Sequence, residues 1–164
     1  MKTIYNYLNE YSESDFYGMH MPGHKRNEKM MENDLPYKID ITEIDGFDDL
    51  HHADGIIREA QERAARLYGA DETHFLVNGS TVGILSAIMG VTDKGDQILV
   101  ARNCHKSVYH AIYLNGLEPV YVYPEYDEKT GLNGEVKADE IALLLEKNPN
   151  IKAVMIVSPT YDGV

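Results

Sequence analysis

The chain has 164 residues, of which 15 are basic and 27 acidic, so its formal net charge is −12. This length suggests one domain with a sizeable core, and the acidity argues against nucleic acid or an anionic membrane as a partner. No apolar run approaches the roughly 20 residues of a membrane span, and the first residues lack an apolar signal-peptide core. Cys104 is the only cysteine, which excludes an intrachain disulfide and favours a cytoplasmic location.

The first third of the sequence differs in pattern from the rest. Apolar and tyrosine residues at helical spacing predict one short helix within residues 1–15. Residues 16–54 contain proline, glycine and a dense acidic run but little periodicity, which indicates a long ordered arm with loops. We therefore divide the chain into an N-terminal helix and arm with an acidic loop, residues 1–54, and a second region, residues 55–164.

From residue 55 onward, helical and strand patterns alternate. Apolar residues at helical spacing predict four helices, and short apolar runs predict four strands. In chain order these are helix 56–67, strand 73–77, helix 84–89, strand 97–101, helix 108–114, strand 120–123, helix 139–147 and strand 153–157. Such alternation is typical of right-handed βαβ units, and continuous apolar strands fit a parallel sheet that is covered on both faces.

Ligands of parallel sheets bind beyond the carboxyl ends of the strands, so the residues that follow each predicted strand are the candidates for chemistry. These residues are 78–81, 102–107, 124–126 and 158–163. The first of these segments, Asn78-Gly79-Ser80-Thr81, joins a strand to a helix. Free helix amides and the two hydroxyls there would bind an anion, most simply a phosphate, although Ser and Thr also serve as ordinary N-caps. The segment matches neither a GxxxxGKS/T loop nor a GxGxxG turn.

The second segment contains His105, at the same predicted sheet edge as the candidate phosphate site. A neutral imidazole at this position can stack on a flat ligand or move protons. Taken alone, a capping or surface histidine is the simpler interpretation. The sequence therefore leaves both interpretations of His105 open.

Other polar clusters fit structural roles better. The seven histidines show no helical HxxxH pair and no cysteine cluster, so a metal site is not predicted. An acidic run could attract a cationic substrate or form a solvated loop, and four tyrosines suit packing at strand ends. The acidic residues are Asp40, Glu43, Asp45, Asp48, Asp49 and Asp54, and the tyrosines are Tyr121, Tyr123, Tyr126 and Tyr161.

Five motifs occur in the order typical of one enzyme family. They are Met21-Pro22-Gly23-His24-Lys25-Arg26, Asp40-Ile41-Thr42-Glu43 with Asp49-Leu50-His51-His52, Asn78-Gly79-Ser80-Thr81, Arg102-Asn103-Cys104-His105-Lys106-Ser107 and Ser158-Pro159-Thr160-Tyr161-Asp162-Gly163. Together they resemble the N-terminal portion of the ornithine/lysine/arginine decarboxylase family. The resemblance implies an α/β fold, an αβα sandwich with a mostly parallel sheet, as a partial large domain of the aspartate-aminotransferase fold (fold type I). Residues 55–164 would be the partial domain that binds pyridoxal 5'-phosphate (PLP).

The resemblance also implies roles for individual residues. Those expected to bind the cofactor are Gly79, Ser80, Thr81, His105, Ser158 and Thr160. The first three would hold the phosphate, His105 would stack on the pyridine ring as the one catalytic residue, and one of the last two would lie near the phenolic oxygen. The His24 segment and the acidic loop would border the active site or a partner subunit.

The implied reaction is decarboxylation of arginine, lysine or ornithine, with release of carbon dioxide through a cofactor aldimine, in a cytoplasmic homodimer. In this family the aspartate beside the ring nitrogen and the Schiff-base lysine follow later than Val164, and neither Lys25 nor Lys106 fits that lysine. The 164-residue chain is therefore expected to be inactive by itself. An aminotransferase or carbon–sulfur lyase of the same fold, a non-catalytic remnant that binds a full-length relative, and an independent flavodoxin-like phosphate-ligand domain are the alternatives.

Overall fold

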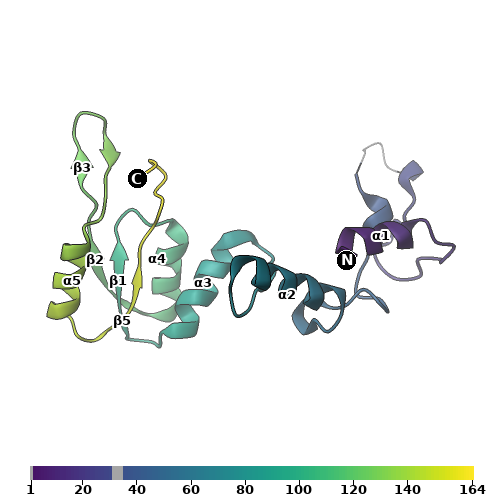
Figure 1. Cartoon of the computed structure of the whole chain (residues 1–164), viewed down its shortest axis with the longest axis horizontal. Helices are drawn as coiled ribbons and strands as arrows, with labels where there is room; N and C mark the ends of the chain where they lie inside the picture. Colours follow the sequence, from purple (N-terminus) through teal and green to yellow (C-terminus); the bar gives the residue numbers. More distant parts are fainter. Residues whose placement is uncertain (1, 31–34) are drawn as a thin grey trace. The chain divides into compact units, whose positions relative to one another are not determined.

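A computed structural model describes residues 2–30 and 35–164 of the chain, which forms two compact units. The first unit spans Met1–Phe75 and the second spans Leu76–Val164. Figure 1 shows the elements of both units along the chain. The sequence predicts a boundary between two regions after residue 54, and this boundary stays a prediction. Within the described residues, no helix has the length and apolar character needed to cross a bilayer.

The first unit consists of short helices joined by loops (Figure 1). Its elements are α1 (Ile4–Ser12), the 3₁₀ turns η1 (Glu28–Met30), η2 (Tyr37–Ile39) and η3 (Leu50–His52), and α2 (Ile56–Tyr68). Thr3 caps α1, because its side chain accepts a hydrogen bond from the amide of Asn6. Gly69 ends α2 in the left-handed conformation, with φ 66°. The helices predicted within residues 1–15 and from residue 56 are therefore confirmed.

The Met21–Arg26 motif folds back onto α1. The Arg26 guanidinium donates to the carbonyl oxygen of Tyr11 at 2.9 Å and lies 4.7 Å from the centre of the Tyr11 ring. His24 Nε2 lies 3.1 Å from Asp40 Oδ2, and its ring meets Tyr37 edge-on. These contacts give the described part of the arm a defined structure, in which the regular elements are the short turns η1, η2 and η3.

Asp48 organises the acidic loop and the start of α2. Gly55, the N-cap of α2, has no side chain with which to cap the helix, and the Asp48 carboxylate takes over this task. Its Oδ1 accepts from the amides of Asp49 and Asp54, and its Oδ2 accepts from those of Gly55, Ile57 and Arg58. Burial opposes ionisation of Asp48, but the backbone hydrogen bonds outweigh it and hold the pKa of this carboxyl far below its usual range. At least this member of the acidic run therefore has a structural role.

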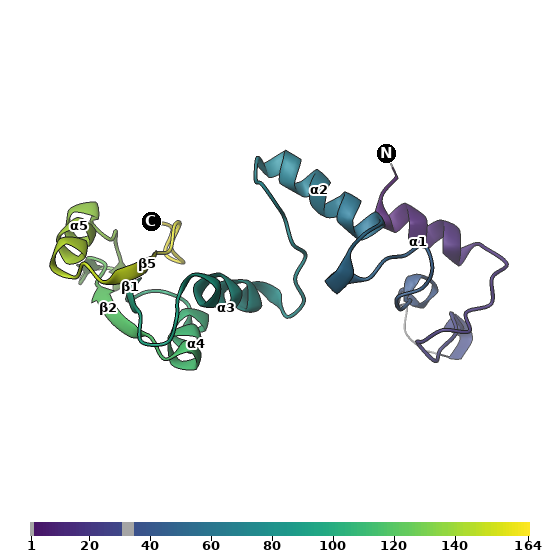
Figure 2. The same ribbon diagram turned by 90° about the horizontal axis from the view of Figure 1, so that it is seen from below.

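The second unit is a three-layer α/β structure. Its strands β1 (Gln97–Ala101), β2 (Glu118–Val122) and β5 (Ile151–Met155) form a parallel sheet in the order β2-β1-β5. Its helices are α3 (Gly79–Val91), α4 (Lys106–Asn115) and α5 (Ala138–Lys147). Seen from below in Figure 2, α4 lies on one face of the sheet and α5 on the other. The αβα architecture and the parallel sheet predicted from the sequence are thus confirmed.

Residues 73–77, predicted as a strand, form no strand. Residues 73–77 pair with none of the three strands of the sheet, β2, β1 and β5. A short apolar run becomes a strand only where a neighbour accepts its backbone hydrogen bonds. Instead, Leu76 packs close to the backbone of α3 at Gly83. The structure also contains a small antiparallel hairpin, β3 (Tyr126–Asp127) and β4 (Leu132–Asn133), that the sequence does not predict.

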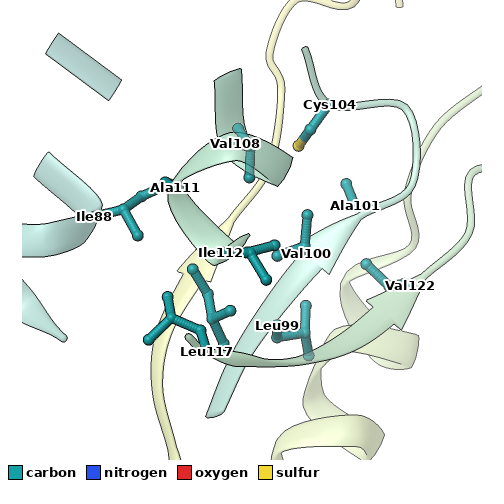
Figure 3. Packing of buried hydrophobic residues seen from close by; sticks show 11 residues of the cluster. Ile88, Leu99, Val100, Ala101, Cys104, Val108, Ala111, Ile112, Leu117 and Val122 are labelled. Atoms are coloured by element: carbon teal, nitrogen blue, oxygen red, sulfur yellow. The ribbon is translucent and has the colours of Figure 1, made fainter. Parts of the chain in front are cut away.

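The hydrophobic core of the second unit surrounds β1. Four residues of this strand, 98–101, have no exposed surface, as the central position in the sheet requires. Figure 3 shows β1 packed against side chains of α4, with Ile88 of α3 at the margin of the cluster. Ile141 and Leu144 of α5 pack against the same core. This core fixes the carboxyl ends of β1 and β5, from which the candidate site is built.

Candidate functional site

A cavity of about 400 Å³ lies beyond the carboxyl ends of β1 and β5. Its lining comes from α3, from the start of α4, and from the end of β5 with the residues that follow it. The lining residues are Ile84, His105, Val108, Met155, Ile156, Val157, Ser158, Pro159, Thr160 and Tyr161. The cavity therefore contains three of the predicted site residues, and its mostly apolar wall with a few polar groups is typical of small-molecule sites.

His105 lines this cavity and at the same time caps α4. Its Nδ1 accepts a hydrogen bond from the amide of Ser107 at 3.2 Å and lies 2.9 Å from the Ser107 hydroxyl. The two interpretations of His105 that the sequence leaves open are therefore compatible. The cap fixes the imidazole, and the cavity gives it access to a ligand.

The N-terminus of α3 has the features of an anion site. Asn78 and Gly79 both have positive φ, 66° and 69°, and the Asn78 side chain makes no capping hydrogen bond. The first turn of α3 carries no acidic residue. Ser80 and Thr81 are exposed, and the structure gives their hydroxyls no hydrogen-bond partner among the described residues. The amides and hydroxyls of this turn are thus available to an anion, which an ordinary N-cap would not leave open.

Gly79 suits this turn for a steric reason. A Cβ at Gly79 would meet nothing within 4 Å, so the backbone is open to a ligand from that side. The positive φ at this first residue of α3 favours glycine. Gly79, Ser80 and Thr81 do not themselves line the cavity, but Ile84, one helical turn beyond Ser80, does. The cavity therefore contacts α3 through Ile84. Binding of a phosphate by the first turn of α3 stays a prediction.

Ser158 and Thr160 both line the cavity, on the segment after β5. Thr160 belongs to a turn in which its amide donates to the carbonyl of Val164 at 2.8 Å and its Oγ1 accepts from the Val164 amide at 3.2 Å. Ser158 is exposed and makes no hydrogen bond among the described residues. Of the two hydroxyls, that of Ser158 is therefore the more available to a ligand.

Several lining residues were not predicted as part of the site. Tyr161, which the sequence assigns to strand-end packing, is exposed and lines the cavity, so that prediction is wrong. Ile84 and Val108 were predicted only as members of apolar helix faces. Ile84 lies one turn after the segment 78–81 and Val108 directly follows the segment 102–107, so their places near the helix N-termini could have identified them.

The Met21–Arg26 motif and the acidic loop belong to the first unit. Their described contacts are internal to that unit, including the His24–Asp40 pair and the Asp48 cap. The prediction that they border an active site or a partner subunit stays a prediction.

Cys104 is buried between the end of β1 and β5, with its Sγ 3.7 Å from the carbonyl oxygen of Met155. Burial raises the pKa of this thiol, so the reactive thiolate is scarce in the folded chain at neutral pH. We expect Cys104 to react with iodoacetamide roughly tenfold or more slowly in the native chain than in urea at the same pH. Mass spectrometry over time measures both rates, and equal rates would show that the thiol is not protected.

The fold and the site define a class of protein: an α/β protein with a small-molecule cavity at the carboxyl ends of parallel strands and an open helix N-terminus on a neighbouring element. Residues 2–164 match the sequence model of the Orn/Lys/Arg decarboxylase major domain. The chain belongs to the Orn/Lys/Arg decarboxylase family, and the resemblance inferred from its five motifs is confirmed.

Individual relatives agree with this assignment. The Bacillus subtilis protein YaaO is 43% identical over 98% of this chain, which covers 34% of YaaO. The arginine decarboxylase of Halalkalibacterium halodurans is 39% identical over 88% of this chain, which covers 31% of that enzyme. The solved structure of lysine decarboxylase A from Pseudomonas aeruginosa matches 99% of this chain with a TM-score of 0.75 and 27% identity, over 25% of its own length. The chain therefore spans about a third or less of the relatives it matches.

Proposed function

We propose that this chain forms the phosphate-binding and ring-stacking part of a PLP-dependent decarboxylase of basic amino acids. The observation that carries the proposal is the cavity that His105 and Ser158 line beside the uncapped α3. Membership of the decarboxylase family supports the reaction class. Arginine and lysine are the substrates favoured first, because the printed names of the relatives refer to them.

The described residues fit PLP by their chemistry. The first-turn amides of α3 and the hydroxyls of Ser80 and Thr81 would bind the phosphate, and the His105 imidazole would stack on the pyridine ring. When bound, PLP supplies an electron sink for bond cleavage at the α-carbon of an amino acid.

The chain's own contribution is binding, orientation and exclusion of water. Apolar side chains such as Val108, Met155 and Val157 would limit access of water to the bound ring, and Ser158 offers a hydroxyl to its phenolic oxygen. No lysine lines the cavity among the described residues. We therefore infer that the Schiff-base lysine must come from outside this set of residues, and that the 164 residues alone do not complete the reaction.

The proposal extends to the dimer and to the location in the cell. A homodimer and a cytoplasmic location are included in it, and the single cysteine is compatible with the latter. An aminotransferase or carbon–sulfur lyase of the same fold is the alternative chemistry, and a non-catalytic binding partner is the alternative role. A flavodoxin-like domain is disfavoured by the family match over residues 2–164.

A chimera tests this function. Residues 1–164 are joined to the part of the Halalkalibacterium halodurans arginine decarboxylase that follows its matched region, and the purified protein is supplied with PLP. We expect carbon dioxide to be released from arginine, lysine or ornithine, and the release to fall at least about tenfold in the His105→Asn variant. Size-exclusion chromatography reports whether the chimera is a dimer.

Three assays separate the alternatives. Amino transfer to a keto acid without carbon dioxide release would indicate an aminotransferase, and pyruvate release from a cysteine derivative would indicate a lyase. A folded chimera without any of these activities, beside an active parent enzyme, would contradict the catalytic proposal. It would favour the non-catalytic role.

A further inference from the structure

Ser107 is a buried polar residue without a role in the proposed function. It lies in the first turn of α4, and its side chain has no exposed surface. A buried hydroxyl is costly unless it is hydrogen-bonded. The structure gives it one side-chain partner, His105 Nδ1 at 2.9 Å. The same nitrogen also accepts the Ser107 amide at 3.2 Å. The amide and the hydroxyl of Ser107 therefore both contact the same atom, Nδ1 of the His105 ring.

These contacts determine which nitrogen of His105 carries the proton. A backbone amide can only donate, so Nδ1 must accept and cannot hold a hydrogen of its own. The Ser107 hydroxyl can donate to the same lone-pair region. The neutral ring must then carry its proton on Nε2. Two donors on adjoining groups of one residue also restrict rotation of the ring about its χ2 angle.

We propose that Ser107 is a positioning residue that holds His105 in the Nε2–H tautomer and fixes its ring plane for a flat aromatic ligand. The identity of that ligand as PLP rests on the proposed function, whereas the effect of Ser107 on the ring does not. Because a stacking ring that rotates freely loses conformational entropy on binding, a fixed ring binds more tightly. Ser107 would thus contribute to affinity without touching the ligand.

Nitrogen NMR of the 164-residue chain tests the effect on the ring directly. Long-range ¹H–¹⁵N spectra, at a pH where the histidines are neutral, report the protonation of each ring nitrogen, and the His105→Asn variant identifies the His105 signals. We expect His105 Nδ1 to appear as an unprotonated, hydrogen-bonded acceptor. Ser107→Ala keeps the amide donor, so Nδ1 should stay unprotonated, but loss of the hydroxyl contact should shift its resonance toward that of a free acceptor and broaden the ring signals. Ser86→Ala, at an exposed serine on α3, is the control and should change neither.

A double-mutant cycle tests the consequence for binding. We expect Ser107→Ala to weaken PLP binding about fivefold, as the loss of one hydrogen bond predicts. In the His105→Asn background, which keeps a capping side chain, the same substitution should have no further effect. A purely structural role of Ser107 would instead lower PLP affinity equally in both backgrounds, and that result would overturn the proposal.

The two hypotheses fail in different ways. An unchanged His105 nitrogen spectrum in Ser107→Ala would refute the positioning role, whatever binds in the cavity. Failure of the wild-type chain to bind PLP would count against the proposed function, while the nitrogen spectrum would still decide the role of Ser107. Circular dichroism of each variant checks that its helix content equals that of the wild-type chain.

Discussion

Replacing Ser80 and Thr81 together by alanine is expected to weaken PLP binding about 100-fold. Each hydroxyl would give a hydrogen bond to a doubly charged phosphate, and bonds to charged groups contribute about 1.5–3 kcal/mol each. A combined loss of about 3 kcal/mol corresponds to roughly two powers of ten in Kd. The fold should survive, because both side chains are exposed and make no hydrogen bond among the described residues.

The phosphate group itself provides the sharpest control for this prediction. Titrations of the 164-residue chain with PLP and with pyridoxal, which lacks the phosphate, are followed by the absorbance of the pyridine ring. The wild-type chain should prefer PLP, and the double variant should prefer it about 100-fold less, because only the first-turn amides would still hold the phosphate. Ser86→Ala should behave as wild type. An unchanged preference for PLP in the double variant would exclude the first turn of α3 as the phosphate site.

The sequence predicts the second unit well because its core is strongly patterned. The predicted strand 97–101 coincides with β1, whose apolar residues have no exposed surface. Gly116 ends α4 in the left-handed conformation, which glycine adopts most easily, and Gly69 ends α2 of the first unit in the same way. Local chemistry was sufficient in these cases, since periodicity and capping act over a few residues.

Other features depend on partners that periodicity does not reveal. Residues 73–77 have the composition of a strand, but a strand also needs a neighbour that pairs with it, and these residues pair with none of β1, β2 and β5. The site residues likewise divide into those that the sequence can predict and those that depend on the fold. His105 and Ser158 could be proposed from their places after strands, whereas the exposure of Tyr161 depends on how the segment after β5 turns. The dual role of His105 required the position of Ser107, two residues away.

The Asp48→Asn substitution is expected to reduce the free energy of unfolding of the first unit by about 2 kcal/mol. Asparagine has nearly the same shape and tolerates the positive φ of 71° at this position. However, its NH₂ group cannot accept the hydrogen bonds that one carboxylate oxygen now receives, and the helix N-terminus loses a negative charge. Urea unfolding followed by circular dichroism measures the stability. Hydrogen exchange at the amides of Gly55 and Ile57 locates the effect.

The pH dependence of the free energy of unfolding is a second test of the Asp48 cap. Because hydrogen bonds lower the folded-state pKa of Asp48, its contribution is fully present above the unfolded value of about 4 and is lost as the pH falls toward the folded value. The stability of the wild-type unit should therefore decrease below about pH 4, while Asp48→Asn should show a flatter profile there. Asp54→Asn makes the same charge change at a side chain without a hydrogen bond in the described structure, and it should leave both stability and exchange nearly unchanged. Equal destabilisation by the two substitutions would show that net charge, rather than the Asp48 cap, determines the effect.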